Sequence, residues 1–260
     1  MDDTLFSIDG KVALVTGGSR GIGEMIADGF VRAGARTYIT SRKATVCDET
    51  ADRLGEHGTC ISLPHDLSTE EGVNALAAEL AEREDRVDIL VNNAGASWGA
   101  PLEDYPDSAW DKVLAVNVKA VHQLTVKLLP QLRAAASEDD PARVINIGSI
   151  DGMRVPSTEN YAYAASKAAV HMVTRQLAHR LVGDNITVNA IAPGPFPSKM
   201  MAFVLDDPAG REAVAASVPM GRIGRPDDMA GTARFLASRA GSYLTGAVIP
   251  VDGGIASLAQ

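Results

Sequence analysis

Residues 11–23 read "KVALVTGGSRGIG", an apolar run that ends in a turn rich in glycine. The apolar run is typical of a β-strand, and the periodic apolar pattern at about 21–33 is typical of a helix. Gly17, Gly21 and Gly23 let the backbone turn tightly and approach a ligand closely. The first turn of a helix offers unpaired N–H groups and the positive end of the helix dipole. The stretch therefore predicts a strand, a tight turn and a helix that together bind a pyrophosphate.

The glycine spacing departs from the general dinucleotide fingerprint. It is Gly-x-x-x-Gly-x-Gly, whereas the fingerprint is Gly-x-Gly-x-x-Gly. Glycines also end strands for purely steric reasons, so the spacing alone does not decide between a plain turn and a nucleotide site. The position of the glycines between an apolar strand and a helix favours the nucleotide site.

The same alternation of strand and helix continues along the chain. Six further apolar, β-rich runs follow, at residues 36–41, 59–64, 87–93, 142–149, 185–194 and 246–254. Helical patterns lie between them at about 44–56, 70–84, 107–135 and 160–182. Continuous apolar strands separated by helices indicate a parallel sheet covered on both faces, and right-handed crossovers make such a sheet doubly wound. We therefore predict an α/β fold, a doubly wound parallel sheet of the Rossmann type with about seven strands and helices on both faces.

No linker, internal repeat or break in composition divides the chain, so residues 1–260 are predicted to form a single domain. The one long gap between the expected elements is at about 195–218, and it is rich in Met, Pro and Ala. A long excursion inside a compact fold is often an active-site lid. Its apolar residues are expected either to line a flexible pocket or to pack the lid onto the body: Met200, Met201, Phe203, Val204 and Leu205.

The composition excludes several classes of partner. The net charge is −9 and the sequence pI is about 5.0, with no basic run, which argues against nucleic acid or an anionic membrane as partner. The N-terminus is acidic and lacks the apolar region of a signal peptide, and no apolar run approaches membrane-spanning length. Cys47 and Cys60 lack the spacing of metal ligands. A reduced, cytoplasmic protein without a metal site is expected.

Further motifs follow the glycine turn in a fixed order: "DL" (66–67), "NNAG" (92–95), Asn117, Ser149, "YAASK" (163–167) and "PG" (193–194). Each motif alone is weak, but the ordered set is specific. In this set the chain resembles the classical short-chain dehydrogenase/reductase family over nearly its whole length. The resemblance implies a dinucleotide-dependent oxidoreductase, and because members are commonly homotetramers, it implies that assembly too.

The stretch "YAYAASK" (161–167) holds two tyrosines, of which one is a candidate for catalysis. Residues four apart share a face of a helix. Tyr163 is four residues before Lys167, whereas Tyr161 has Ala165 at that offset. Tyr163 is therefore the candidate acid/base, and Tyr161 is expected to line or pack the site. A free tyrosine has a pKa near ~10, and a nearby ammonium or oxidised nicotinamide favours the phenolate.

The resemblance implies three further catalytic roles. Ser149 hydrogen-bonds the substrate carbonyl oxygen, Lys167 holds the nicotinamide ribose, and Asn117 anchors a water that links Lys167 to solvent. From the residues alone two alternatives stay open. Ser149 fits an ordinary turn or helix-cap serine equally well, and Asn117 fits a satisfied buried amide inside a helix, where an isolated asparagine is locally unfavourable.

The second strand, "RTYITS", indicates which dinucleotide is bound. NAD-dependent proteins place an acidic residue near the end of this strand, ~20 residues past the glycines, to bind the ribose 2′-hydroxyl. Here the position holds Ser41, followed by Arg42 and Lys43, and Arg20 lies in the glycine turn. A 2′-phosphate is favoured by cations and repelled by a carboxylate, so the cofactor is predicted to be NADP(H). A solvated loop is the alternative reading of Arg42 and Lys43.

The full set of residues predicted to contact the cofactor extends over the carboxyl ends of the strands. The family usually has threonine at the position of Ser198, so the hydroxyl is retained here but the β-branch is lost. The predicted contacts are Gly17, Ser19, Arg20, Gly21, Ile22, Gly23, Ser41, Arg42, Lys43, Asp66, Leu67, Asn93, Ala94, Gly95, Tyr163, Lys167, Pro193, Gly194, Phe196 and Ser198.

The substrate is predicted from the lid and from the finer resemblance. "NNAGASWGA", "VINIGS" and "APGPFPS" look most like the NADPH-dependent 3-oxoacyl reductases, in the branch associated with rhamnolipid-type β-hydroxyacyl synthesis. Trp98 lies near the site along the chain and is expected to contact substrate or to pack in the core. We predict a reductase of 3-oxoacyl thioesters or related β-keto compounds. The alternatives are a sugar, polyol or small-alcohol dehydrogenase of the same family and, more remotely, a non-catalytic protein that senses nucleotides.

Overall fold

The computed structural model describes residues 3–199 and 201–258. Its centre is one parallel sheet of seven strands in the order β3-β2-β1-β4-β5-β6-β7. From β1 the chain adds strands on one side as far as β3, and then on the opposite side from β4 to β7, so the sheet is doubly wound. The strands are β1 (Val12–Thr16), β2 (Arg36–Thr40), β3 (Cys60–Ser62), β4 (Ile89–Asn92), β5 (Ala142–Ile147), β6 (Ile186–Pro193) and β7 (Val248–Val251).

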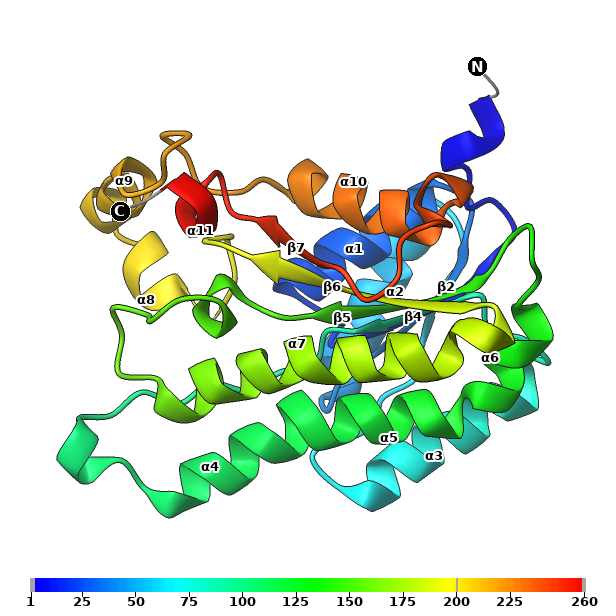
Figure 1. Cartoon of the computed structure of the whole chain (residues 1–260), viewed down its shortest axis with the longest axis horizontal. Coiled ribbons are helices and arrows are strands. Elements are labelled where there is room, and N and C mark those ends of the chain that lie inside the picture. The colour runs from blue at the N-terminus through cyan, green and yellow to red at the C-terminus, as the bar shows by residue number, and fades with distance from the viewer. Residues whose placement is uncertain (1–2, 200, 259–260) are drawn as a thin grey trace.

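Helices cover both faces of the sheet (Figure 1). One face carries α1 (Gly21–Arg32), α2 (Ala44–Gly55) and α10 (Pro226–Ala237). The other carries α3 (Glu70–Arg83), α5 (Ala120–Lys127), α6 (Leu129–Ala135) and α7 (Tyr161–Leu181), with α4 (Asp107–Leu114) beside α7. Three short helices lie beyond the sheet: α8 (Ala202–Leu205), α9 (Pro208–Ala216) and α11 (Ile255–Leu258).

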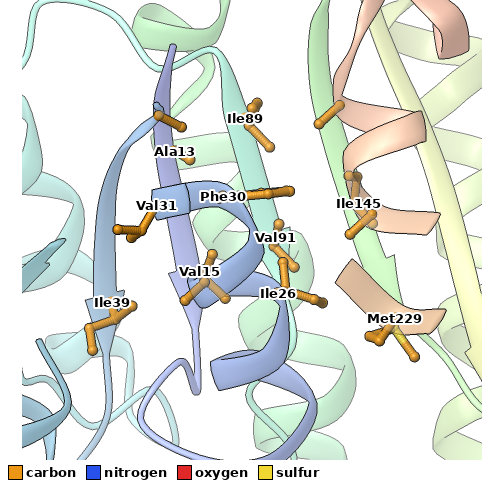
Figure 2. Packing of buried hydrophobic residues seen from close by; sticks show 14 of the residues in the cluster. Ala13, Val15, Ile26, Phe30, Val31, Ile39, Ile89, Val91, Ile145 and Met229 are labelled. Atoms are coloured by element: carbon orange, nitrogen blue, oxygen red, sulfur yellow. The ribbon is translucent and has the colours of Figure 1, made fainter. Parts of the chain in front are cut away.

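The packing of α1 shows how the apolar pattern becomes a core. Ile26 and Phe30 are four residues apart, share one face of the helix and are fully buried. Figure 2 shows them over Val15, Val91 and Ile145 of the sheet. Full burial of a large apolar side chain contributes about 1.5–3 kcal/mol. This face therefore fixes α1, and with it the glycine turn at its N-terminus.

The predicted α/β class, the parallel sheet, its seven strands and the helices on both faces are confirmed. One difference is that the helical pattern at 107–135 is not one continuous helix. A π-turn over Ala115–Lys119 separates α4 from α5, and the chain breaks again before α6. Pro130 stands in the first turn of α6, where it has no N–H to continue the preceding helix.

The strands all point toward one end of the molecule, where α8, α9 and α11 gather (Figure 1). The glycine turn, the "NNAG" segment, Ser149 and Gly194 follow directly after β1, β4, β5 and β6 respectively. In open parallel sheets ligands bind at this edge. Within the described residues, no helix is long and apolar enough to cross a membrane.

Candidate active site

The glycine turn after β1 has a backbone that only glycine fits well. Gly17 and Gly21 have φ values of 65° and 56°, in the left-handed region. A Cβ added at Gly23 would lie 2.3 Å from the carbonyl oxygen of Gly17, so Gly23 also excludes a side chain. Arg20 is the N-cap residue that precedes α1, and its side chain makes no capping hydrogen bond. The turn therefore leaves the first N–H groups of α1 open to a pyrophosphate.

The other residues of the turn lie around it. Ser19 is buried, and its carbonyl oxygen accepts a 3.2 Å hydrogen bond from the hydroxyl of Thr50 on α2. Ile22 packs against the core under α1, whereas the side chain of Arg20 is exposed. Arg20 is thus the predicted contact in this turn whose side chain is presented to solvent and to an incoming ligand.

Asn93 ties the end of β4 to the glycine turn. Its side-chain amide donates to the carbonyl oxygens of Thr16, at 2.8 Å, and Gly17, at 3.2 Å. In return the hydroxyl oxygen of Thr16 accepts from the backbone N–H groups of Asn93 and Ala94, both at 2.9 Å. These bonds hold two strand ends in register and form the floor beneath a dinucleotide. Thr16 is a positioning residue that the sequence analysis missed.

Lys167 is enclosed at the centre of the site. It is 5% exposed, and its ammonium donates to the carbonyl oxygen of Ile147 at 2.7 Å. The ammonium lies 5.5 Å from the centre of the Tyr163 ring. A Cβ added at Gly95 would lie 3.9 Å from Lys167 Nζ and 3.4 Å from Asn117 Oδ1. The structure therefore brings Tyr163, Lys167, Asn117 and Gly95 together.

Ser149 joins this group from the turn after β5. Its hydroxyl oxygen accepts from the backbone N–H of Asp151 at 3.1 Å, so it does cap the short turn Ile150–Gly152. It also hydrogen-bonds the side chain of Tyr163, which lowers the pKa of that phenol. Ser149 is therefore a cap of the turn, as the structural alternative expects, and the same cap holds its hydroxyl toward Tyr163.

Burial governs the protonation of Tyr163 and Lys167. Although part of Tyr163 is exposed, burial raises the pKa of its phenol to about 12, against the bond from Ser149 and with the charge of Asp151. Burial also lowers the pKa of Lys167 to about 8. The expected lowering of the tyrosine pKa is therefore not met by the chain alone, because desolvation outweighs the hydrogen bond from Ser149. At neutral pH Tyr163 is a phenol, the form that donates a proton.

Asn117 lies in the π-turn between α4 and α5 and is 1% exposed. Its Oδ1 accepts from the backbone N–H of Ala96 at 2.8 Å, and its Nδ2 donates to Ala96 O and Ser166 Oγ, both at 2.9 Å. The reading as a satisfied buried amide thus fits its side chain. The second lone pair on Oδ1 remains able to accept a hydrogen bond from a water.

Tyr161 faces a different space from Tyr163. Its hydroxyl donates to the carboxylate of Glu159 at 3.3 Å, and its ring lies edge-on to Tyr105, with 5.2 Å between ring centres. The hydroxyl of Tyr105 donates to Trp98 O and accepts from the N–H of Ala162, both at 3.2 Å. Tyr161 thus lines a hollow of about 560 Å³ together with Leu102, Tyr105, Trp110, Val155, Pro156, Thr158, Asn160 and Ala164.

Trp98 is neither a core residue nor a clear wall of the catalytic group. It is 39% exposed, and the ammonium of Lys112 lies 5.1 Å from its ring centre. A cation at this distance over an indole ring is an attractive contact. The contact with Lys112 orients the ring on the rim of the site, so the expected core packing is wrong.

The residues predicted to select the 2′-phosphate lie after β2. Ser41 donates a weak hydrogen bond to the carbonyl oxygen of Lys43, at 3.4 Å. Arg42, Lys43 and Arg20 are exposed, and none of them makes an ion pair within residues 3–199 and 201–258. Their charges are available to an anion. No acidic residue stands among Ser41, Arg42 and Lys43.

Asp66 and Leu67 flank the adenine side of the predicted site. The carboxylate of Asp66 accepts from the N–H of Ser68 at 2.9 Å and from its hydroxyl at 2.8 Å. Leu67 is 6% exposed and packs in the core under α3. The carboxylate of Asp66 keeps a second oxygen for a ligand, whereas the side chain of Leu67 serves the core.

The segment after β6 returns to the glycine turn. A Cβ added at Gly21 would lie 3.3 Å from the Cβ of Ser198, so the serine hydroxyl is placed beside the N-terminus of α1. A Cβ added at Gly194, after β6, would lie 2.8 Å from the Cα of Asp252, so Pro193 and Gly194 pass close to the end of β7. A cavity of about 390 Å³ opens here, lined by Gly21, Pro197, Ser198, Lys199, Ala202, Leu205, Asp206 and Arg211.

Not every predicted contact points a side chain at the site. Phe196 is 2% exposed, and its ring fills the space that a Cβ at Gly224 would need, at 2.4 Å. The ring of Phe196 therefore packs in the core, and only its backbone is left for a cofactor. In the segment 195–218 Leu205 is buried, so this side chain packs onto the body. Met200 and the side chain of Phe203 lie outside the described residues.

Two further residues near the catalytic group are not among those predicted from the sequence motifs. Tyr105 bonds both to the loop after β4 and to the first turn of α7, so it couples Trp98 to the helix of Tyr163. His171 is 4% exposed one turn beyond Lys167. Helical spacing from Lys167 is the signal that would have found His171, whereas the sequence gives no comparable signal for Tyr105.

Comparison with known proteins supports this geometry. A protein-family model described as enoyl-(acyl carrier protein) reductase matches residues 17–256. The chain is 55% identical over 249 residues to a rhamnolipids biosynthesis 3-oxoacyl-(acyl-carrier-protein) reductase of Pseudomonas aeruginosa, covering 96% of this chain and 97% of that protein. It is 37% identical over 252 residues to a galactitol 2-dehydrogenase of Cereibacter sphaeroides, covering 96% and 97%.

Solved structures give the same result. The Pseudomonas aeruginosa RhlG/NADP active-site complex superposes with a TM-score of 0.96 at 54% identity, covering 98% of this chain and 100% of that one. A gluconate 5-dehydrogenase from Burkholderia cenocepacia in complex with NADP and tartrate superposes with a TM-score of 0.89 at 32% identity, covering 98% of each chain. The fold is thus similar to that of enzymes solved with NADP.

Proposed function

The chain belongs to the short-chain dehydrogenase/reductase family and is an oxidoreductase, and from that premise we propose that it uses NADPH to reduce 3-oxoacyl thioesters to 3-hydroxyacyl thioesters. One observation carries the proposal. A phenol that burial keeps protonated, Tyr163, lies beside Ser149 and Lys167, at the same edge of the sheet as a glycine turn and exposed cations that fit NADP. The similarity to a 3-oxoacyl-(acyl-carrier-protein) reductase supports the thioester.

Each residue of the centre then has a chemical role. The hydroxyls of Ser149 and Tyr163 donate hydrogen bonds to the substrate carbonyl oxygen and polarise it. Bound NADPH supplies the hydride that reduces the carbonyl carbon. Tyr163 gives its proton to the oxygen as negative charge develops there, and Ser149 steadies that charge by a second hydrogen bond. The product is a secondary alcohol, and Tyr163 is left to regain a proton.

Lys167 has a double role in this scheme. One of its three N–H donors is committed to Ile147 O, at 2.7 Å, which leaves two for the hydroxyls of the nicotinamide ribose. Its charge lowers the cost of the transient phenolate on Tyr163. We assign the return of the proton to a water held near Asn117, whose Oδ1 lies on the same side of Gly95 as Lys167 Nζ.

The cofactor-binding residues follow from the cleft. Gly17, Gly21 and Gly23 with the N-terminus of α1 hold the pyrophosphate, and Ser198 adds a hydroxyl beside it. Arg20, Ser41, Arg42 and Lys43 hold the 2′-phosphate, and Asp66 with its neighbours meets the adenine. Asn93, Ala94 and Gly95, together with Pro193, Gly194 and the backbone of Phe196, would hold the nicotinamide half.

We expect kcat/KM for NADPH to exceed that for NADH by about ten- to a hundredfold. A charge-assisted hydrogen bond from Arg42 to a 2′-phosphate is worth roughly 1.5–3 kcal/mol, at ~1.4 kcal/mol per decade. The double substitution Ser41→Asp with Arg42→Ala should shift the ratio toward NADH. Arg180→Ala, an exposed arginine at the far end of α7, is the matched control and should leave the ratio unchanged. An NADH preference in the wild type would show that these side chains do not face the ribose.

The substrate is tested by an NADPH-depletion screen across 3-oxoacyl thioesters, cyclic ketones, quinones and keto-sugars. We expect the highest kcat/KM with a medium-chain 3-oxoacyl thioester, because each buried methylene of the chain adds about 0.8 kcal/mol. The names of other relatives, galactitol and gluconate dehydrogenases, favour a sugar or polyol as the second candidate. A clear preference for a keto-sugar would replace the thioester proposal by that candidate.

The surroundings of the reaction are part of the same proposal. We assign the segment 195–218, which contains α8 and α9, to a lid over the substrate. We assign the protein to the cytoplasm.

We further propose a homotetramer. Exposed apolar side chains on α4, α5 and α7 support it, namely Leu114, Val126 and Met172 at 37%, 41% and 52% exposure. Light scattering measures the mass directly, and a monomer would reject the assembly.

A further inference from the structure

We propose that His171 is a positioning residue of the active site, a wedge of fixed shape that sets the turn 148–152 and thereby aims the hydroxyl of Ser149 at the substrate. The inference rests on the proposed catalytic role of Ser149. It assigns a function to a buried histidine that takes no part in the chemistry derived above and touches neither substrate nor cofactor in that scheme.

The position of His171 on α7 is the first observation. It is four residues beyond Lys167, so the two side chains share one face of the helix. His171 is 4% exposed, although histidine is only seldom fully enclosed in proteins. A buried polar ring at this place needs a reason, since an aliphatic side chain would fill the helix face without a desolvation cost.

The second observation is the fit between the imidazole and the turn. A Cβ added at Gly148 would lie 2.2 Å from His171 Nε2, and a Cβ added at Gly152 would lie 3.0 Å from His171 Cε1. The ring therefore occupies the space that side chains at both positions would need. Gly148 and Gly152 bracket Ser149 on either side along the chain. The imidazole and the two glycines together fix the path of the backbone between them.

Backbone hydrogen bonds and packing on α7 also hold this turn. Gly148 N–H donates to the carbonyl oxygen of Ile191 on β6 at 2.7 Å, which anchors its start. Gly152 N–H donates to the carbonyl oxygen of Ser149 at 3.0 Å, which closes the turn on itself. A Cβ at Gly152 would also lie 2.6 Å from the backbone nitrogen of Ala168, so the turn rests on α7. On that helix, His171 is a side chain that meets the turn at both Gly148 and Gly152.

The third observation concerns the charge of the ring. Burial, with the charges of Lys167 and Arg175 on α7, lowers the pKa of His171 to about 4, against a hydrogen bond with the backbone of Gly152. The imidazole is therefore neutral at working pH and adds no second cation beside Lys167. Within the described residues Nε2 is buried and has no hydrogen-bond partner. The ring thus acts through its shape.

The chain offers a sharp set of variants. His171→Leu removes the planar ring, and His171→Asn keeps a neutral N–H donor but not the ring. Thr174→Val is the matched control, because Thr174 is fully buried one turn further along α7 and hydrogen-bonds Asn146 at 2.9 Å. That control removes a buried hydrogen bond to β5, three residues further along the helix.

The experiment measures kcat, the KM for NADPH and the thermal midpoint, with the best carbonyl substrate of the wild type. We expect His171→Leu to lower kcat about ten- to a hundredfold, the scale of a 1 Å misplacement, with the KM for NADPH unchanged. His171→Asn should keep most of that loss, because the shorter amide does not fill the space of the ring. Thr174→Val should lose stability but keep kcat. In a Ser149→Ala background His171→Leu should cost less than about twofold, because residues that act through one another are non-additive.

Three outcomes would overturn the inference: an unchanged kcat in His171→Leu, an equal loss in Thr174→Val, or an undiminished loss in the Ser149→Ala background. Each is separable from failure of the proposed function. If the wild type reduces none of the carbonyl compounds, the function is wrong. If the wild type is active and His171→Leu equals it, the function stands and the positioning role is wrong.

Discussion

The Tyr163→Phe variant is expected to lose about two to four orders of magnitude in kcat, the scale of positioned acid/base catalysis, while its fold and its affinity for NADPH persist. The loss follows from the proton that Tyr163 holds. Burial raises the pKa of this phenol to about 12, so the side chain is a neutral donor throughout the physiological range. Phenylalanine keeps the ring and its packing but has no proton to give.

Tyr161→Phe is the matched control, since it removes the same atom two residues away. The Tyr161 hydroxyl bonds to the carboxylate of Glu159 at 3.3 Å and faces the hollow beside Tyr105. We expect kcat to change by less than about twofold in this variant, as for the loss of a weak surface contact. Single-turnover kinetics with NADPH, together with fluorescence titration of the cofactor, separate chemistry from binding. Equal losses in the two variants would contradict the choice of tyrosine.

The two tyrosines also show what could be predicted from the sequence. The period of a helix alone separates Tyr163, which pairs with Lys167, from Tyr161, which does not. The glycine turn was predictable for a similar reason. Its backbone has positive φ at Gly17 and Gly21 and no room for a Cβ at Gly23, so the permitted residue types are few and the pattern is legible.

Contacts between distant parts of the chain could not be predicted in this way. The hydroxyl of Thr16 holds a segment 77 residues away, and Tyr105 caps a helix 57 residues away. Neither has a local signal, because the partners meet only after the sheet and helices have packed. The interrupted helical pattern at 107–135 is predictable only in part. Pro130 marks the break before α6 in the sequence, but nothing local marks the π-turn at Asn117.

The protonation states depend on packing in the same way. A reading of the motif places an ammonium near a phenol and predicts a lowered tyrosine pKa. The folded structure buries both groups, and burial raises the pKa of Tyr163 and lowers that of Lys167. Desolvation depends on the whole environment of a group, so it is not visible in a short stretch of sequence. Lys167 thus carries a cost in stability that can be measured.

Lys167→Met is expected to remove most activity and at the same time to stabilise the protein. The native pKa of Lys167 is about 8, compared with the ordinary value of 10.5. The unfolded chain therefore holds this proton more tightly, at a cost to the native state of about 3 kcal/mol at neutral pH, taking about 1.36 kcal/mol for each pH unit. Methionine has a similar length and no charge to desolvate. Losing the bond to Ile147 O offsets about 1 kcal/mol of the gain.

The pH dependence of native stability gives the direction of the effect expected from Lys167. Between about pH 8 and 10.5 the unfolded chain binds more protons at Lys167 than the native protein does, so native stability should rise with pH across that window. The Lys167→Met variant should lack that rise. Lys127→Met, an exposed lysine on α5, is the matched control and should keep both the wild-type profile and activity.

Denaturant unfolding at several pH values, at one fixed protein concentration and without cofactor, measures these stabilities. We expect Lys167→Met to exceed the wild type by about 2 kcal/mol at neutral pH and to meet it near the top of the window. Its kcat should fall by about two orders of magnitude or more, because the phenolate of Tyr163 loses its neighbouring charge. A variant both inactive and less stable than the wild type would mean that the ammonium, with its bond to Ile147, holds the fold together. The buried charge at the centre of the site would then be a structural support, and its desolvation would not be a cost borne for catalysis.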